Sequence, residues 1–187
     1  MAADLGSYYH LGYRSRTPAD GMTHRIRVEV DRSGTRVRYR KSYQSKTAHE
    51  QVADRLLSCL LHDVGDNPLK IRTELRPGTV ADDKHVKVRL RLQVPLGSLT
   101  LLPMPPLHFG MITVFVVVRD EQGFVSAVRQ STAPVRVPSD RVETDKATDF
   151  VYEVELVMRR GEHVVAAAVR DEMAGTTSYR RAELKLP

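Results

Sequence analysis

The chain has 187 residues, of which 41% are hydrophobic and 28% charged, and its formal net charge is +6. This composition suits one ordinary domain with a core plus a smaller appendage, and no run approaches the ~20 apolar residues of a membrane-spanning helix. The single cysteine, Cys59, excludes a disulfide within the chain, and the lack of tryptophan weighs against a surface that stacks bases or sugars.

The positive charge belongs to the N-terminal segment. Residues 1–46 hold ten Lys or Arg and four Asp or Glu, whereas residues 47–187 hold 19 of each sign. Three stretches of this segment, residues 7–13, 24–31 and 35–43, alternate apolar and polar side chains, which is typical of half-buried strands. We therefore predict a three-stranded antiparallel meander with an arginine-coated face formed by Arg25, Arg27, Arg36, Arg38 and Arg40.

That face suggests one alternative function, which is polyanion or nucleic-acid binding through phosphate contacts. Two observations count against it. The meander carries no base-reading motif, and arginine on the wet face of a strand also serves solubility. We therefore do not expect nucleic acid as a partner.

The next segment, residues 47–66, contains the one predicted helix, which links the meander to the rest of the chain. Val52, Leu56 and Leu60 recur every four residues and form an apolar stripe. Thr47 with Glu50 matches a capping box at the start. Cys59 lies among leucines, so we interpret it as a small buried hydrophobe rather than a reactive thiol.

Residues 67–187 are predicted to form strands only, at 69–75, 85–94, 111–119, 124–130, 149–158, 163–170 and 176–186. Alternation in 85–94 indicates a strand that is wet on one face, whereas 111–118 and 164–169 are apolar on both faces and should be central. About seven short antiparallel strands are typical of an immunoglobulin- or fibronectin-like sandwich. The repeated VRDE of residues 118–121 and 169–172 predicts two hairpins with acidic, solvated tips.

Residues 95–110 (PLGSLTLLPMPPLHFG) are apolar but broken by prolines, so we expect neither a helix nor a central strand there. One interpretation is a long connection packed over the sandwich edge or against the helix. The other is an exposed patch that meets a protein partner or a second copy of the chain. The apolar side chains concerned are Leu99, Leu101, Leu102, Met104, Leu107 and Phe109.

The N-terminal pattern resembles the closing strands of von Willebrand factor A-related domains common in Acidobacteria. The matching residues are Tyr9, Leu11, Gly12, Tyr13, Asp20, Gly21, His24, Arg25, Ile26, Arg27, Val28, Val30, Gly34, Val37, Arg38, Arg40 and Tyr43. Ser42 departs from the family pattern, which tends to have glycine there. The later part is also similar, with a turn at Asn67-Pro68-Leu69, a β-rich module, and a close through Val169-Arg170-Asp171 to Pro187.

The resemblance implies that residues 1–46 end a domain whose metal-binding D-x-S-x-S loop lies upstream. It also implies an exported or envelope-associated adhesion-like protein without enzymatic activity, although this chain shows no signal peptide.

The residues themselves give no catalytic or metal motif. Asp31, Ser33 and Thr35 fit D-x-S-x-T, but they lead into an alternating strand and arginines surround them, so we interpret them as a turn. The seven histidines show no zinc-ligand spacing. We expect no enzyme, no metal and no cofactor. The function predicted from the sequence is a non-catalytic structural or protein-interaction module.

Overall fold

The computed structural model describes residue 12, residues 19–34 and residues 37–187. Its contacts divide the chain into two compact units, Met1–Glu50 and Gln51–Pro187. The protein is mainly β, and its strands pair antiparallel throughout the described residues.

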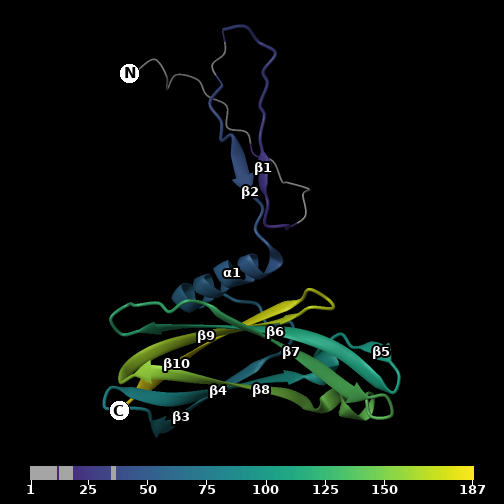
Figure 1. Cartoon of the computed structure of the whole chain (residues 1–187), viewed down its shortest axis with the longest axis vertical. Coiled ribbons are helices and arrows are strands. Elements are labelled where there is room, and N and C mark those ends of the chain that lie inside the picture. Colours follow the sequence, from purple (N-terminus) through teal and green to yellow (C-terminus); the bar gives the residue numbers. More distant parts are fainter. Residues whose placement is uncertain (1–11, 13–18, 35–36) are drawn as a thin grey trace. The chain divides into compact units, whose positions relative to one another are not determined.

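The first unit holds a small two-stranded sheet. Strands β1 (Thr23–Arg25) and β2 (Ser42–Gln44) place His24 opposite Tyr43, with the two rings stacked at 5.2 Å. Past these strands the chain continues as two extended arms joined by a turn (Figure 1), where Gly34 takes a φ of +73°. The strands are shorter than the predicted 24–31 and 35–43, and of the predicted strand at 7–13 only Gly12 is described.

The thinness of this unit explains the short strands. None of its described residues is buried. Longer strand pairing would therefore not be stabilised by the burial of apolar side chains. A two-stranded hairpin by itself is marginally stable in water. One further backbone bond, from the Ile26 N–H to the Lys41 carbonyl oxygen (2.8 Å), joins the arms next to the strands. The rest of the arms keeps its alternation of apolar residues and arginines outside the strands.

Helix α1 (Ala48–His62) confirms the predicted helix. Its start has the reciprocal bonds of a capping box, because the Glu50 N–H donates to Thr47 Oγ1 (3.2 Å) and the Thr47 N–H donates to Glu50 Oε2 (2.7 Å). Val52, Leu56, Cys59 and Leu60 are the buried residues of the helix.

Two sheets make up the rest of the second unit. The larger has the strand order β10 (Thr177–Leu186), β9 (Gly161–Asp171), β6 (Leu107–Asp120) and β5 (Leu102–Met104), and β7 (Arg129–Pro138) also pairs with β6. The smaller has the order β3 (Arg72–Val80), β4 (His85–Pro95) and β8 (Asp149–Arg159). The short 3-10 turns Leu96–Ser98 and Thr144–Ala147 flank the smaller sheet.

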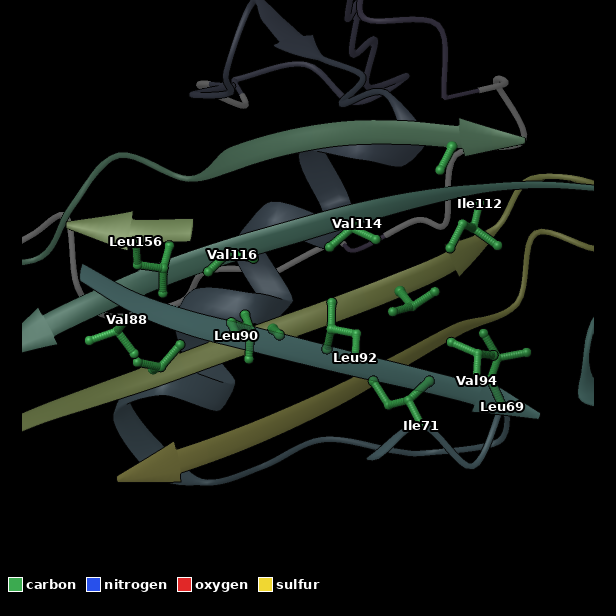
Figure 2. Packing of buried hydrophobic residues seen from close by; sticks show 14 of the residues in the cluster. Leu69, Ile71, Val88, Leu90, Leu92, Val94, Ile112, Val114, Val116 and Leu156 are labelled. Atoms are coloured by element: carbon green, nitrogen blue, oxygen red, sulfur yellow. The ribbon is translucent and has the colours of Figure 1, made fainter. Parts of the chain in front are cut away.

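The main core lies between these sheets. Leu90 and Leu92 of β4 and Val114 and Val116 of β6 are at most 4% exposed and belong to one cluster. Figure 2 shows side chains from both sheets converging in this layer. Alternation in β4 therefore follows from one buried face, as predicted.

A second core lies on the other face of the larger sheet, under the helix. Leu56, Cys59 and Leu60 pack there with Phe115 and Ala168. Strands β6 and β9 are thus buried on both faces, which confirms the central positions predicted for them. After the helix, the chain passes close to strand β10 at Gly65. An added Cβ at this position would lie only 2.7 Å from Tyr179 Cβ.

Five of the seven predicted strands match β4, β6, β8, β9 and β10, and two predictions need correction. The strand expected at 69–75 begins only at Arg72, because Asn67 Oδ1 accepts the Ile71 N–H (2.8 Å) and holds a turn there. The strand expected at 124–130 is wrong, since β7 covers Arg129–Pro138. Its prolines are tolerated because β7 lies at a sheet edge, where outward positions need no N–H donor.

Candidate functional site

The segment interpreted as an apolar connection or patch contains a β-hairpin. After the 3-10 turn at Leu96–Ser98, strand β5 pairs antiparallel with the start of β6. Leu102 lies opposite Phe109 and Met104 opposite Leu107, so these four side chains share one face. The prediction that residues 95–110 form no central strand holds for β5, which is a three-residue edge strand. It is wrong for residues 107–110, because they begin β6, which pairs with β5 on one side and β7 on the other.

The six candidate residues separate into two groups. Leu99 and Leu101 are partly buried against the core between the sheets. The other four form what we call the hairpin patch: Leu102, Met104, Leu107 and Phe109. Leu102 is 47% exposed and Met104 59% exposed, whereas Leu107 and Phe109 are half-buried.

The register places the hairpin patch on the same face of the larger sheet as the helix. Odd-numbered residues of β6 include Phe115 and Val117, which pack in the cluster under α1. Leu107 and Phe109 continue this odd-numbered row beyond that cluster. The patch is therefore an extension of the apolar sheet face.

The opposite face of the hairpin borders a hollow of about 250 Å³. Leu99, Leu101, His108 and Val142 line it, with Glu143 and Lys146 paired at its rim (2.6 Å). The His108 Nδ1 atom is buried and has no hydrogen-bond partner among the described residues. The lining offers apolar contact and one imidazole rather than a set of catalytic groups.

Gly110 leaves the space beside this hollow that the Leu101 side chain fills. A Cβ at position 110 would lie 2.7 Å from Leu101 Cδ2 and 3.2 Å from the Thr100 carbonyl oxygen, so any other residue there would displace the leucine. The hollow was not predicted from the sequence. The glycine between Phe109 and Met111 was the one local signal of a close approach.

The prediction of two acidic, solvated hairpin tips is wrong for the tip at residues 169–172, because Asp171 is buried. Asp171 is 1% exposed, and its carboxyl oxygens accept the N–H groups of Thr100 (2.7 Å), Met173 (2.8 Å) and Ala174 (3.3 Å). It thereby fastens the segment before β5 to the turn between β9 and β10. At the other tip, Asp120 is partly exposed and accepts the Gln122 and Phe124 N–H groups.

The arginines of the alternative polyanion site all lie in the first unit. Arg25 is in β1, while Arg27, Arg38 and Arg40 lie in the extended arms, and all four are exposed. Arg27 pairs with Glu29 at 2.5 Å. Arg36 lies outside the described residues.

Among the residues that the structure describes, no group of three or more His, Cys, Asp or Glu side chains is arranged to hold a metal ion. Asp31 and Ser33 are exposed at the turn between the arms. No described helix is long and apolar enough to cross a membrane.

Cys59 offers a first prediction, because it is 2% exposed and burial raises the pKa of its thiol. We expect the native protein to react slowly with a thiol reagent at pH 8, since the thiolate is the reactive form. Addition of urea should release one fast-reacting thiol, measured by absorbance of the released chromophore. Fast stoichiometric labelling of the native chain would contradict the buried interpretation.

No protein-family model and no curated protein matches the chain. Among solved structures, a structural-genomics target called SoR45 aligns with a TM-score of 0.43 and 12% identity, covering 65% of this chain and 89% of that one. Two structures of β-glucuronidase from Bacteroides uniformis, one bound to a cyclophellitol-type aziridine, align with TM-scores of 0.41 and 0.40 at 6% identity. Each glucuronidase alignment covers 61% of this chain and 13% of the other. These likenesses are too distant to carry a functional argument.

Proposed function

We propose that the chain is a non-catalytic protein-interaction module and that the hairpin patch is its contact surface. The observation that carries the proposal is the exposure of Leu102 and Met104 on an ordered edge hairpin. Apolar side chains that gather on one face and stay exposed mark interaction surfaces more often than scattered ones do. A second copy of the chain is the partner to test first.

The experiment is sedimentation velocity of the full chain over a wide concentration range. The wild type should grow in size with concentration, and Leu102→Asp should weaken association by about tenfold or more, because it places a charge in an apolar contact. Phe124→Asp is the matched control, since Phe124 is 68% exposed but lies outside the patch. A wild type that stays strictly monomeric, or two variants that behave alike, would contradict self-association through the patch.

We also propose that the two large sheets form an immunoglobulin- or fibronectin-like sandwich. Antiparallel pairing and a core between the sheets support this. Apart from the three-residue β5, the strands of the second unit number seven. Many cell-surface domains share this sandwich architecture, although the fold by itself does not decide the function.

Kinship with von Willebrand factor A-related proteins remains part of the proposal. The pairing of His24 with Tyr43 falls inside the residues that carry the resemblance, and the arms on either side of the turn stay extended. On this proposal the first unit corresponds to the closing strands of such a domain, and the second unit is the interaction module. Polyanion binding through the arginines is the alternative, and retention on heparin at low salt is its test.

A further inference from the structure

The far edge of strand β8 is the longest regular sheet edge of residues 51–187, all of which the structure describes. It runs from Asp149 to Arg159 without a proline and without a register shift against β4, and no described strand pairs with its other side. An open edge of this kind presents unpaired backbone donors and acceptors to a further strand.

The other long edges are interrupted or partly occupied. Strand β7 contains Pro134 and Pro138, and β3 has Pro77 with a register shift that follows it. Along β10, the Tyr179 N–H donates to the Asp66 carbonyl oxygen (2.9 Å). The edge of β8 is therefore the one long edge of the second unit that has no proline, no register shift and no backbone hydrogen bond to a described loop.

The backbone groups at this edge follow from the ladder with β4. In line with the register, the Leu96 N–H donates to the Thr148 carbonyl oxygen and the Arg160 N–H to the Lys84 carbonyl oxygen. Because bonded pairs alternate in antiparallel sheets, even-numbered residues of β8 bond to β4 and odd-numbered residues direct their N–H and C=O groups outward. The outward groups belong to Val151, Glu153, Glu155 and Val157.

The side chains at the edge favour a basic strand. Glu153 and Glu155 are half-exposed on the outer face of the sheet. Glu153 forms an ion pair with Arg89 of β4 (3.6 Å), and Glu155 forms one with Lys87 (3.0 Å). In the register of fullest overlap, a second β8 would place Glu153 opposite Glu155, and like charges directly opposite destabilise a sheet. On the inner face, Tyr152 and Val154 stay partly exposed, so a strand with apolar side chains on that face would cover them.

One segment of this chain has the matching pattern. In residues 37–41, Val37 and Tyr39 alternate with Arg38 and Arg40, and this arm lies outside the described strands. Tyr39 is 41% exposed, and no described residue of the first unit is buried. Paired antiparallel with β8, Arg38 can face Glu155 while Arg40 faces Glu153.

We propose that the edge of β8 accepts an extended basic strand, and that the strand it takes is residues 37–41 of a second copy. This surface is separate from the hairpin patch, so the proposal does not rest on that patch. The contact is heterologous, because edge and strand are different surfaces, and it joins copies head to tail.

The first test uses a labelled synthetic peptide of residues 37–43 and the full chain carrying Leu102→Asp, which removes the hairpin contribution. Fluorescence anisotropy should show saturable binding that is about tenfold weaker for Glu153→Lys/Glu155→Lys. The control Asp83→Lys/Asp140→Lys makes the same charge change at exposed acids elsewhere and should bind as the parent does. If the parent, the edge variant and the control bind the peptide equally, or if the parent does not bind it, the proposal that the β8 edge accepts this strand is wrong.

Hydrogen exchange of the same complex distinguishes strand pairing from mere charge attraction. The amides of Val151, Glu153 and Glu155 should become protected by the peptide, whereas those of Tyr152 and Val154 are already slow. Val151→Pro should weaken binding without a charge change, because it removes the outward donor that lies opposite Ser42 of the peptide. Protection without this alternation would contradict an added strand.

The second-copy assignment is tested with full chains, again with Leu102→Asp. Arg38→Glu/Arg40→Glu and Glu153→Lys/Glu155→Lys should each self-associate more weakly than the parent, and mixing them should restore association, because one supplies the basic strand and the other the acidic edge. Peptide binding combined with monomeric chains would overturn the second copy as occupant. Because hairpin contacts are removed throughout, these failures leave the proposed function untouched.

Discussion

Asp171→Ala is expected to lower the free energy of unfolding by about 3 kcal/mol, because it leaves three backbone N–H groups without their acceptor at a site that is 1% exposed. The change also frees the Thr100 segment, which precedes the hairpin. Urea denaturation followed by circular dichroism measures the effect as a shift of the midpoint at unchanged slope.

The other VRDE tip supplies the matched control. Asp120→Ala removes a carboxyl group that accepts two N–H groups in a more exposed turn, so its cost should be about 1 kcal/mol. Equal losses of unfolding free energy for Asp171→Ala and Asp120→Ala would contradict a special structural role for Asp171. Asp171→Asn should fall between them, since the amide keeps one acceptor oxygen.

Leu56→Ala is the second large prediction, with an expected loss of about 3 kcal/mol. Leu56 is fully buried in the cluster of α1 with Phe115 and Ala168, and its removal leaves a cavity under the helix. Because that cluster shares strands β6 and β9 with the main core, helix and sheets should unfold in a single transition at a lower urea concentration.

Leu61→Ala tests whether the loss comes from docking rather than from helix propensity. Leu61 lies on the same helix but is 49% exposed, so its truncation should cost no more than about 0.5 kcal/mol. A separate early transition of the helical signal in Leu56→Ala, with the sheets unchanged, would contradict a shared core.

Much of the fold could be predicted because its signals are local. The alternation in β4 arises from one buried face, and the unbroken apolar runs of β6 and β9 arise from burial on both faces. The helix was visible from the spacing of Val52, Leu56 and Leu60 together with the capping box. These patterns need no knowledge of strand order.

What was missed depends on partners that are distant in the sequence. The strand predicted at 124–130 stopped short of β7, whose two prolines fit an edge strand, and that edge position follows only from the sheet order. Asp171 looked like a solvated turn residue because its donor Thr100 lies 71 positions away. The burial of that acid follows from tertiary contacts alone.

The candidate site shows the same division. Composition singled out the six apolar residues of 95–110, but only the pairing of β5 with β6 separates Leu99 and Leu101 from the hairpin patch. The open edge of β8 was invisible for a related reason, since a strand's alternation does not reveal whether it has one neighbour or two.

The most direct test of the interaction proposal is photo-crosslinking from the hairpin patch. A benzophenone amino acid placed at Met104 in the full chain should give adducts between protein molecules whose yield rises with concentration, whereas the same group at Phe124 should not. Crosslinks from Met104 that remain within one molecule at every concentration would contradict the account.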